Sequence, residues 1–394
     1  MDRTLIFNGR IITPYRTINN GSILVEDGKI ADISEGRLPV SECTTIDAKG
    51  LYVSPGFIDI HTHGGGGFDF MDGTVEAYLG AAIEHAKHGT TALVPTTVTS
   101  TKESLKETFE IYKKAKASKN KGAALLGLHL EGPYFSMEQR GAQDPRYIKN
   151  PEREEYEEIL SWSDDIIRWS AAPELDGAME FGRFLKEKNI LPSIGHSNAI
   201  YEEVIEAFEN GYTHITHLYS GMSGVRRINA YRYAGVIESA FLIDEMTVEI
   251  IADGAHLPSS LLKLIYKIKG PDKIALVTDS MRAAGMPEGE SILGGIRDGQ
   301  KVIVEDGVAK LPDRTAFAGS VATADRLVRT MINIAEVPLI DAVRMMTTTP
   351  AKIMKIDDRK GSIVVGKDAD LVIFDEDINI QTTMVEGEVV YSRQ

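Results

Sequence analysis

Residues 56–63 form the stretch GFIDIHTH, a short apolar run that ends in two histidines. Its length and its apolar residues are typical of a buried strand. Successive side chains of a strand point to opposite faces, so Asp59, His61 and His63 are expected on the same face. The stretch therefore predicts a buried strand that carries polar side chains to its C-terminal end.

Seven further apolar runs follow this one, and amphipathic helical stretches separate them. In chain order the eight runs are 56–61, 91–96, 125–131, 166–173, 191–196, 214–218, 248–253 and 274–279. Helices are expected at 75–87, 102–116, 202–209 and 259–269, and after the eighth run at 322–334 and 339–346. Eight alternating strand and helix units predict an α/β fold, a (β/α)₈ TIM-like barrel.

Both ends of the chain carry short strand patterns instead of this alternation. Asp27-Gly28 is a hairpin signal near the start, and Glu386-Gly387 marks a turn near the end. We expect residues 1–54 and 357–394 to pair into a small β-sandwich domain, with the barrel, residues 55–356, inserted between them. An excursion with a hairpin turn at Asp306-Gly307 is expected at 291–311, after the eighth strand.

Composition excludes several classes of protein. The chain has 394 residues, of which 43% are hydrophobic and 26% charged, as in ordinary globular proteins. Its net charge of −15 would repel nucleic acid and anionic membranes, so neither is an expected partner. The single cysteine, Cys43, allows no internal disulfide and no thiolate metal site, and we expect a cytoplasmic protein.

Polar side chains gather where the predicted strands end. Glu131 ends the third run, His196 the fifth and Asp279 the eighth, while His217 lies at the end of the sixth. A barrel places its chemistry at the C-terminal ends of its strands, so these residues should join His61 and His63 on one rim. Six such groups would be costly to hold together without a cation. Imidazole and carboxylate ligands without thiolate suit zinc, iron or a similar divalent ion.

Other histidines are expected to play different roles. His85 and His88 lie near the end of the first helix, where a polar group suits the helix dipole. His214 is three residues before His217, so it should point to the opposite face and be structural. His129 and Asp59 lie one layer deeper than the rim, where each could support a ligand or simply belong to the core.

The glycine run 64–67 and a group of arginines complete the candidate features. The run lacks the Gly-Lys-Ser/Thr ending of a phosphate loop, so close backbone approach beside the metal site is expected. Arg226, Arg227 and Arg232 follow the sixth strand, and His256 follows the seventh. These cationic groups could bind an anionic substrate or be merely solvated, and charge alone favours neither.

Six short motifs of the chain resemble one known family. They are 57–64 FIDIHTHG, 129–133 HLEGP, 195–197 GHS, 216–219 THLY, 252–256 ADGAH and 278–282 TDSMR. The first is similar to the hallmark of the amidohydrolase superfamily, and together the motifs resemble its N-acetylglucosamine-6-phosphate deacetylase family. The similarity runs nearly end to end and includes residues 361–371.

The resemblance implies a metal-dependent hydrolase. Glu131, His196 and His217 would hold the main ion, and His61 and His63 would be available for a second one. Zn²⁺ is expected first, with Fe²⁺, Co²⁺ or Mn²⁺ as alternatives, at one or two ions per subunit. No lysine ends the fourth run, so Glu131 becomes the bridging candidate.

The resemblance also implies a reaction and a substrate. Asp279 would take a proton from water and pass it to the departing amine, giving glucosamine 6-phosphate and acetate in amino sugar catabolism. Gln143 or its backbone would lie near the acetamide. Arg232, supplied by a partner subunit, would help to bind the phosphate or sugar, which implies a homodimer. The other implied substrate contacts are Ala142, Ser220, Gly221, Asp253, His256, Ala318 and Gly319.

Two departures from the family pattern keep other readings open. Ser220-Gly221 stand where the family usually has Asn-Ala, and Tyr233-Ala234 where it has Glu-Pro. A related substrate such as N-acetylgalactosamine 6-phosphate is therefore an alternative. Another amidohydrolase, opening cyclic amides or deaminating a base, would gain nothing from the arginines. A non-enzymatic relative in assembly or regulation should have lost metal ligands, and none is missing.

Overall fold

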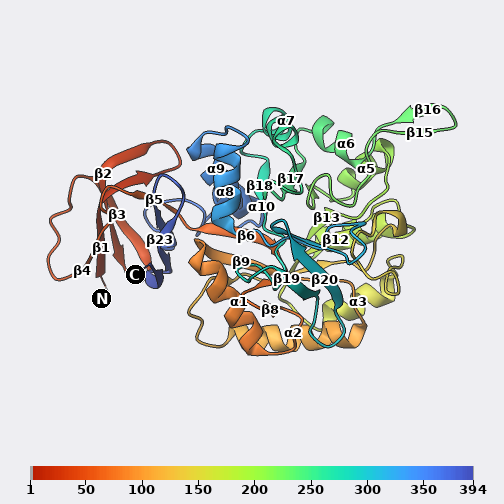
Figure 1. Ribbon diagram of the computed structural model, residues 1–394, viewed down its shortest axis with the longest axis horizontal. Coiled ribbons are helices and arrows are strands. Elements are labelled where there is room, and N and C mark those ends of the chain that lie inside the picture. Colours follow the sequence, from red (N-terminus) through yellow and green to blue (C-terminus); the bar gives the residue numbers. More distant parts are fainter. Residues whose placement is uncertain (1–2, 394) are drawn as a thin grey trace.

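The computed structural model describes residues 3–393, and it shows a barrel with a separate sheet beside it (Figure 1). The sheet contains strands from both ends of the chain, drawn in red and in dark blue (Figure 1). The two chain ends lie close together in this sheet, as predicted (Figure 1). Within the described residues, every helix is too short or too polar to cross a membrane.

The barrel has eight parallel strands with helices on its outside, which confirms the predicted fold class. The strands are β6 (Phe57–Thr62), β9 (Thr90–Thr97), β11 (Leu128–Glu131), β12 (Ile166–Ala171), β13 (Leu191–Ile194), β14 (His214–Ile215), β17 (Thr247–Ile250) and β18 (Ile274–Leu276). They pair in that order from β9 to β18, and β6 pairs with β9. Backbone hydrogen bonds from Asp279 to His61, 2.9 Å, and from His63 to Ser280, 2.8 Å, join the remaining edges.

The third predicted strand is divided in two. A short strand β10 (Ala124–Leu125) pairs with β9 at Ala92 and Leu93, and β11 resumes the pairing at Thr96. The register shifts by one residue between the two pieces, so the chain contains a bulge there. The apolar pattern of 125–131 could not reveal this shift, because alternation does not mark an inserted residue.

Four predicted helices have the predicted bounds: α1 (Val75–Lys87), α2 (Lys102–Lys116), α7 (Ser259–Lys269) and α9 (Leu339–Met346). Thr74 and Thr101 explain two of these starts, because their side chains accept hydrogen bonds from Ala77 and Ser104. Two more, α5 (Tyr201–Glu209) and α8 (Ala324–Asn333), lie within two residues of prediction. The remaining helices are α3 (Arg153–Ser161), α4 (Ala178–Glu187), α6 (Val236–Leu242), α10 (Thr348–Ile353) and the 3₁₀ turn η1 (Met137–Gln139).

The sheet outside the barrel contains eight strands. They are β1 (Arg3–Ile12), β2 (Thr17–Glu26), β3 (Lys29–Glu35), β4 (Thr44–Asp47), β5 (Tyr52–Pro55), β22 (Leu371–Phe374), β23 (Ile380–Val385) and β24 (Glu388–Ser392). The antiparallel pair β5 and β22 joins the two ends of the chain, with Val53 opposite Ile373. Both residues belong to a hydrophobic core separate from that of the barrel. The exact boundaries at 54/55 and 356/357 stay a prediction.

Three excursions shape the rim of the barrel. Strands β7 (Gly64–Gly65) and β8 (Phe68–Asp69) follow β6, and a hairpin of β15 (Arg226–Ile228) and β16 (Tyr231–Tyr233) follows β14. The predicted excursion after the eighth strand is a small sheet of β19 (Gly289–Leu293), β20 (Gln300–Glu305) and β21 (Val308–Lys310). Its hairpin turn is at Asp306-Gly307, as expected.

Candidate metal centre and active-site cavity

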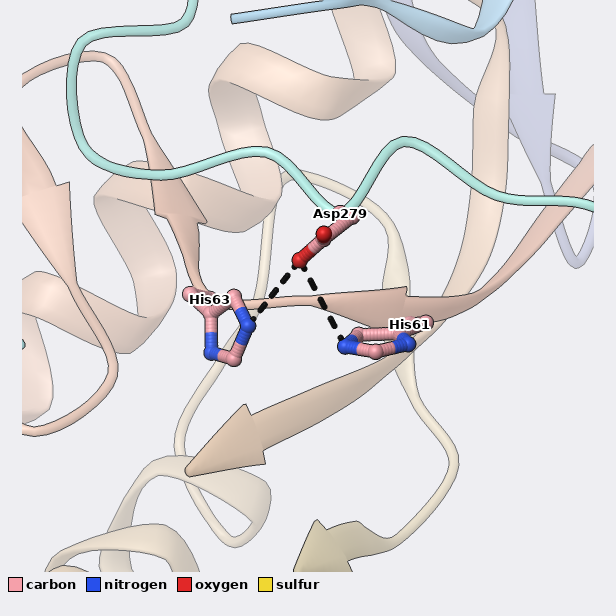
Figure 2. Close-up of side chains that lie close together, drawn as sticks. All are labelled: His61, His63 and Asp279. Carbon is pink, nitrogen blue, oxygen red and sulfur yellow. Dashed lines mark ion pairs between the residues drawn. The ribbon is translucent and has the colours of Figure 1, made fainter. Parts of the chain in front are cut away.

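The six side chains predicted at the strand ends form two adjoining clusters, all buried. We call them the first cluster, Glu131, His196 and His217, and the second cluster, His61, His63 and Asp279. Within each cluster the candidate ligand atoms lie within 4.8 Å of one another. Figure 2 shows the second cluster, in which His61 belongs to β6, His63 directly follows β6, and the segment after β18 supplies the aspartate.

Glu131 lies between the two clusters. Its Oε1 is 2.9 Å from Nε2 of His217, 3.3 Å from Nε2 of His196 and 3.6 Å from Nε2 of His61. Its Oε2 is 3.4 Å from Nε2 of His63. One carboxylate therefore faces the Nε2 atoms of four imidazole rings, which is the position expected of a bridging ligand.

Asp279 faces the second cluster only. Its Oδ1 is 3.1 Å from Nε2 of His63 and 3.5 Å from Nε2 of His61 (Figure 2). Its side chain is 10% exposed, whereas those of Glu131 and His61 are 3% and 0% exposed. Asp279 thus combines contact with the cluster and access to the space above it.

Hydrogen bonds at Nδ1 turn the Nε2 atoms toward the centre. Backbone carbonyls face Nδ1 of His63, at 3.2 Å from Thr96, and Nδ1 of His196, at 2.9 Å from Gln139. A carbonyl only accepts, so both rings carry a proton on Nδ1 and direct Nε2 toward the clusters. Nε2 of His61 is buried without a hydrogen-bond partner among the described residues. This orphaned atom and the four-imidazole, two-carboxylate donor set fit a divalent ion.

The electrostatics of the clusters favour positive charge between them. Burial alone would raise the pKa of Glu131, but His61 and the hydrogen bonds from His196 and His217 hold that pKa well below its ordinary value. Burial would lower the pKa of His63, but Asp279 and Glu131 raise it well above the ordinary value. The carboxylates that stabilise a proton on these histidines would also stabilise a metal cation in its place. The clusters are therefore suited to bind a metal ion.

Three of the six residues reach the centre through an unusual backbone conformation. His196, His217 and Asp279 have φ angles of 48°, 29° and 47°, in the left-handed region. Their neighbours Thr216 and Thr278 already hydrogen-bond inside the barrel, so strict alternation would point the following residue outward. The left-handed turn returns each side chain to the rim, at about 1–2 kcal/mol per residue. Such strain is typical of functional sites.

Asp59 and His129 lie one layer below the clusters. Asp59 accepts a hydrogen bond of 2.5 Å from the hydroxyl of Thr278, and burial raises the pKa of its carboxyl to about 7. His129 contacts the hydroxyls of Thr96 and Ser170, and its ring centre is 4.7 Å from that of His61. Both residues therefore pack beneath the rim and support it.

His214 corrects one prediction. Its Nε2 lies 3.4 Å from Oε1 of Glu249, a residue inside the barrel that also contacts His61. His214 therefore points into the barrel, one layer below His217, and the expected opposite face was wrong. The left-handed turn at His217 breaks the alternation on which that expectation depended. His214 lies outside both clusters.

The two histidines near the end of α1, His85 and His88, contact neighbouring segments and do not face the clusters. Nε2 of His85 lies 3.1 Å from the hydroxyl of Thr62 and 3.1 Å from the carbonyl of Gly64. Burial lowers the pKa of His85 to about 4, so its ring is neutral. Gly64 itself packs so closely on Phe68 that a side chain would overlap the Phe68 carbonyl, which confirms the expected close backbone approach. His88 pairs with Asp325 of α8 at 3.1 Å.

A cavity of about 270 Å³ opens directly above the clusters. Its floor contains five of the six cluster residues, and His61 lies beneath them. The predicted substrate contacts that line it are Ala142, Gln143, Ser220, Gly221, His256 and Gly319. Six lining residues were not predicted: Val98, Gly141, Tyr219, Leu293, Ala316 and Phe317. Leu293 and Phe317 come from the β19–β21 region, whose position over the barrel no sequence motif indicates.

Three predicted contacts do not line the cavity of their own chain. Asp253 lies behind His256 and accepts a hydrogen bond of 2.8 Å from its Nδ1. Ala318 is fully buried beside Gly319. Arg232 is exposed on β16, in a hairpin that projects away from the barrel (Figure 1).

Gln143 contacts the metal centre as well as the cavity. Its side-chain amide donates a hydrogen bond of 2.8 Å to Oε2 of Glu131, and its carbonyl oxygen accepts one of 2.9 Å from the backbone of Thr99. These two bonds fix the orientation of the amide, since only its NH₂ group can face the carboxylate. Gln143 thus holds the oxygen of Glu131 that faces the second cluster.

Sequence reasoning missed a buried ion pair, Arg168 with Glu249, directly below the clusters. Both side chains are fully buried. Arg168 is the only charged residue of the apolar run 166–173, and Glu249 is the only one inside the run 248–253 before its last residue, Asp253. That pattern was the available signal, because charged residues are almost never buried unless they are paired.

Known proteins resemble this chain over almost its full length. The sequence profile of the Amidohydrolase family matches residues 52–390. An N-acetylglucosamine-6-phosphate deacetylase of Bacillus subtilis (strain 168) is 35% identical, over 98% of this chain and 97% of the relative. An N-acetylgalactosamine-6-phosphate deacetylase of Escherichia coli O157:H7 is 31% identical, over 96% and 97%.

A solved structure is similar to this chain over its full length. It is a variant of N-acetyl-D-glucosamine-6-phosphate deacetylase from Mycobacterium smegmatis in complex with N-acetyl-D-glucosamine-6-phosphate. The two folds superpose with a TM-score of 0.90 at 28% identity, over 100% of each chain. The similarity includes the barrel and the sheet formed by the chain ends.

Proposed function

Because the chain belongs to the amidohydrolase family, we propose that it hydrolyses the acetamide of N-acetylglucosamine 6-phosphate to glucosamine 6-phosphate and acetate. One observation carries this proposal above all. Two clusters of imidazoles and carboxylates lie at the floor of a 270 Å³ cavity, and three polar residues expected to contact the substrate line it: Gln143, Ser220 and His256. A relative with this activity has its own substrate bound in a structure of the same fold.

The residues of the two clusters would hold a divalent metal. We propose Zn²⁺, with Fe²⁺, Co²⁺ or Mn²⁺ as alternatives, and one ion for each cluster: Glu131, His196 and His217 would hold the first, and His61 and His63 with Glu131 the second. The ion supplies Lewis acidity toward the attacking water and the acetamide carbonyl. Glu131 faces imidazoles of both clusters, which supports a bridging role.

Asp279 is the proposed general base and then the general acid. Its carboxylate lies at the cavity floor, and the imidazoles of His61 and His63 hold its pKa below the ordinary value despite burial, which favours the ionised form. An ionised carboxylate can accept the proton of the attacking water and pass it to the departing amine. This transfer avoids release of a free amide anion.

The sugar and phosphate would be held by the wall of the cavity. Ser220, Gly221 and His256 line the cavity, and Asp253 fixes the ring of His256 through Nδ1. The exposed position of Arg232 outside its own cavity supports the proposal that a partner subunit's hairpin supplies this arginine. We therefore propose a homodimer. A cytoplasmic location stays a prediction.

The galactosamine epimer is the second candidate substrate. A relative of 31% identity carries the name N-acetylgalactosamine-6-phosphate deacetylase, and it matches 96% of this chain. Ser220 and Gly221, which replace the usual Asn-Ala, lie in the cavity wall. A smaller wall at this point could accommodate either arrangement of the sugar hydroxyl.

Acetate release from N-acetylglucosamine 6-phosphate, its galactosamine epimer and unphosphorylated N-acetylglucosamine tests the proposed substrate. We expect the highest kcat/KM with the glucosamine phosphate and a loss of about 10²-fold or more without the phosphate, because a charge-assisted contact contributes about 1.5–3 kcal/mol and the site offers several. A higher kcat/KM with the epimer would assign the second candidate. No acetate from either phosphate would reject both.

A further inference from the structure

Glu249 of β17 connects the two clusters from below. Its Oε2 lies 3.1 Å from Nδ1 of His61, in the second cluster. The same oxygen accepts a hydrogen bond of 3.2 Å from the backbone N–H of His217, in the first cluster. A single carboxylate oxygen thus contacts one metal-binding residue of each cluster, and it is fully buried.

Arg168 of β12 holds Glu249 in this position. Its Nη1 donates both to Oε1 of Glu249 and to the carbonyl of Ile60, while Nε and Nη2 donate to the hydroxyls of Ser193 and Thr216. These bonds extend to strands on both sides of Glu249. The carboxylate therefore has one oxygen committed to the guanidinium and the other left for His61 and His217.

We infer that Glu249 is a positioning residue that fixes the tautomer of His61, so that Nε2 of this ring keeps its lone pair for an ion in the second cluster. The inference rests on the proposed metal centre. An ionised carboxylate can only accept, so the proton of the ring is on Nδ1. Nε2 then points at Glu131 and Asp279 without a proton of its own, which matches its orphaned state. Outer carboxylates of this kind orient metal-binding histidines in proteins.

Glu249→Gln tests whether Glu249 fixes the tautomer of His61 or only fills space in the barrel, because the substitution preserves the size of the side chain. The guanidinium of Arg168 requires an acceptor, so the amide oxygen takes the place of Oε1 and the NH₂ group faces His61. Since NH₂ only donates, Nδ1 of His61 must become the acceptor and its proton moves to Nε2. An Nε2 that carries a proton cannot bind a metal ion.

Metal binding gives the first readout. Glu249→Gln is expected to weaken binding of the ion in the second cluster by about 10- to 100-fold, measured by competition with a chelator, and to affect the first cluster much less, because there it removes only an acceptor for the backbone N–H of His217. Asp325→Asn is the matched control: it also removes a partly buried carboxylate from an ion pair, with His88, but that pair lies outside both clusters. It should bind both ions with unchanged affinity. Unchanged binding in Glu249→Gln, or equal weakening of both ions, would overturn the inference.

A second readout works in the unsubstituted protein, so it survives if Glu249→Gln fails to fold. In zinc-loaded protein with ¹⁵N-labelled histidine, His61 should show its proton on Nδ1, shifted by the carboxylate. A proton on Nε2 of His61 would overturn the inference without any variant. Failure of this inference can be told apart from failure of the proposed function. If the wild-type protein binds no divalent ion, the proposed metal centre itself is rejected.

Discussion

Asp279 and Glu131 are both buried carboxylates of the metal centre, yet their surroundings separate their roles. Glu131 contacts imidazoles of both clusters, and Gln143 holds its second oxygen. Asp279 contacts only His61 and His63, and it is the more exposed of the two carboxylates. A bridging ligand needs fixed oxygens, whereas a group that moves a proton needs access to the reacting atoms. The structure therefore suits Glu131 to binding and Asp279 to proton transfer.

Asp279→Asn tests this division of roles. The amide cannot accept the proton of the attacking water, so kcat should fall by about 10²- to 10⁴-fold. The metal content should stay as in the wild type, and KM should change little. Both are measured on the same preparation, by acetate release and by metal analysis. Loss of one ion would instead make Asp279 a required ligand of the second cluster.

At the scale of elements, alternation in the sequence predicted the barrel strands but not the way in which they end. His61, His63 and Glu131 follow the period of two, so counting placed them correctly. His196 and Asp279 reach the same rim only because their φ angles are positive. The sequence could place these two residues at strand ends, but their orientation depends on tertiary hydrogen bonds that alternation does not encode.

The β15–β16 hairpin carries the proposed contribution of a partner subunit. Arg232 on β16 pairs in register with Arg227 on β15, and both are exposed. Arg232→Ala is expected to raise KM for the phosphorylated sugar by about 10-fold with little change in kcat, because a phosphate contact acts equally in the ground and transition states. Arg227→Ala is the matched control, with the same loss of charge on the same hairpin, and should leave KM unchanged.

Mixed dimers decide whether the arginine acts across subunits. A subunit with Asp279→Asn lacks the proposed general base but keeps Arg232, and a subunit with Arg232→Ala has the reverse defect. If the arginine acts in the partner's cavity, mixing the two should restore a population of sites with the low wild-type KM. A KM that stays high in every mixture would place Arg232 in its own cavity or outside the site.

At the scale of the whole molecule, the sequence predicted the composite architecture because its signals are local. The β patterns at both ends, the hairpin turns and the eight apolar runs each follow from neighbouring residues. The missed features are contacts between distant segments. Arg168 and Glu249 are 81 residues apart, and Phe317 reaches the cavity from beyond the eighth strand. No local pattern indicates which distant residues such groups contact.

The structure shows where some of the acidic residues behind the net charge of −15 lie. Several of the acidic residues are buried in the metal centre and its support, where they attract a cation and do not face solvent. The overall charge therefore does not exclude a small anionic substrate in a cavity whose floor would hold metal ions. It argues only against extended polyanions as partners.

Metal dependence is the central claim, and one titration tests it most directly. The protein is stripped with a chelator and titrated with Zn²⁺ while acetate release from N-acetylglucosamine 6-phosphate and bound metal are measured together. Activity should be absent from the stripped protein and should return in proportion to bound metal, saturating at two ions per subunit. Full acetate release by protein that holds less than a tenth of an ion per subunit, roughly the trace level after chelation, would contradict the account.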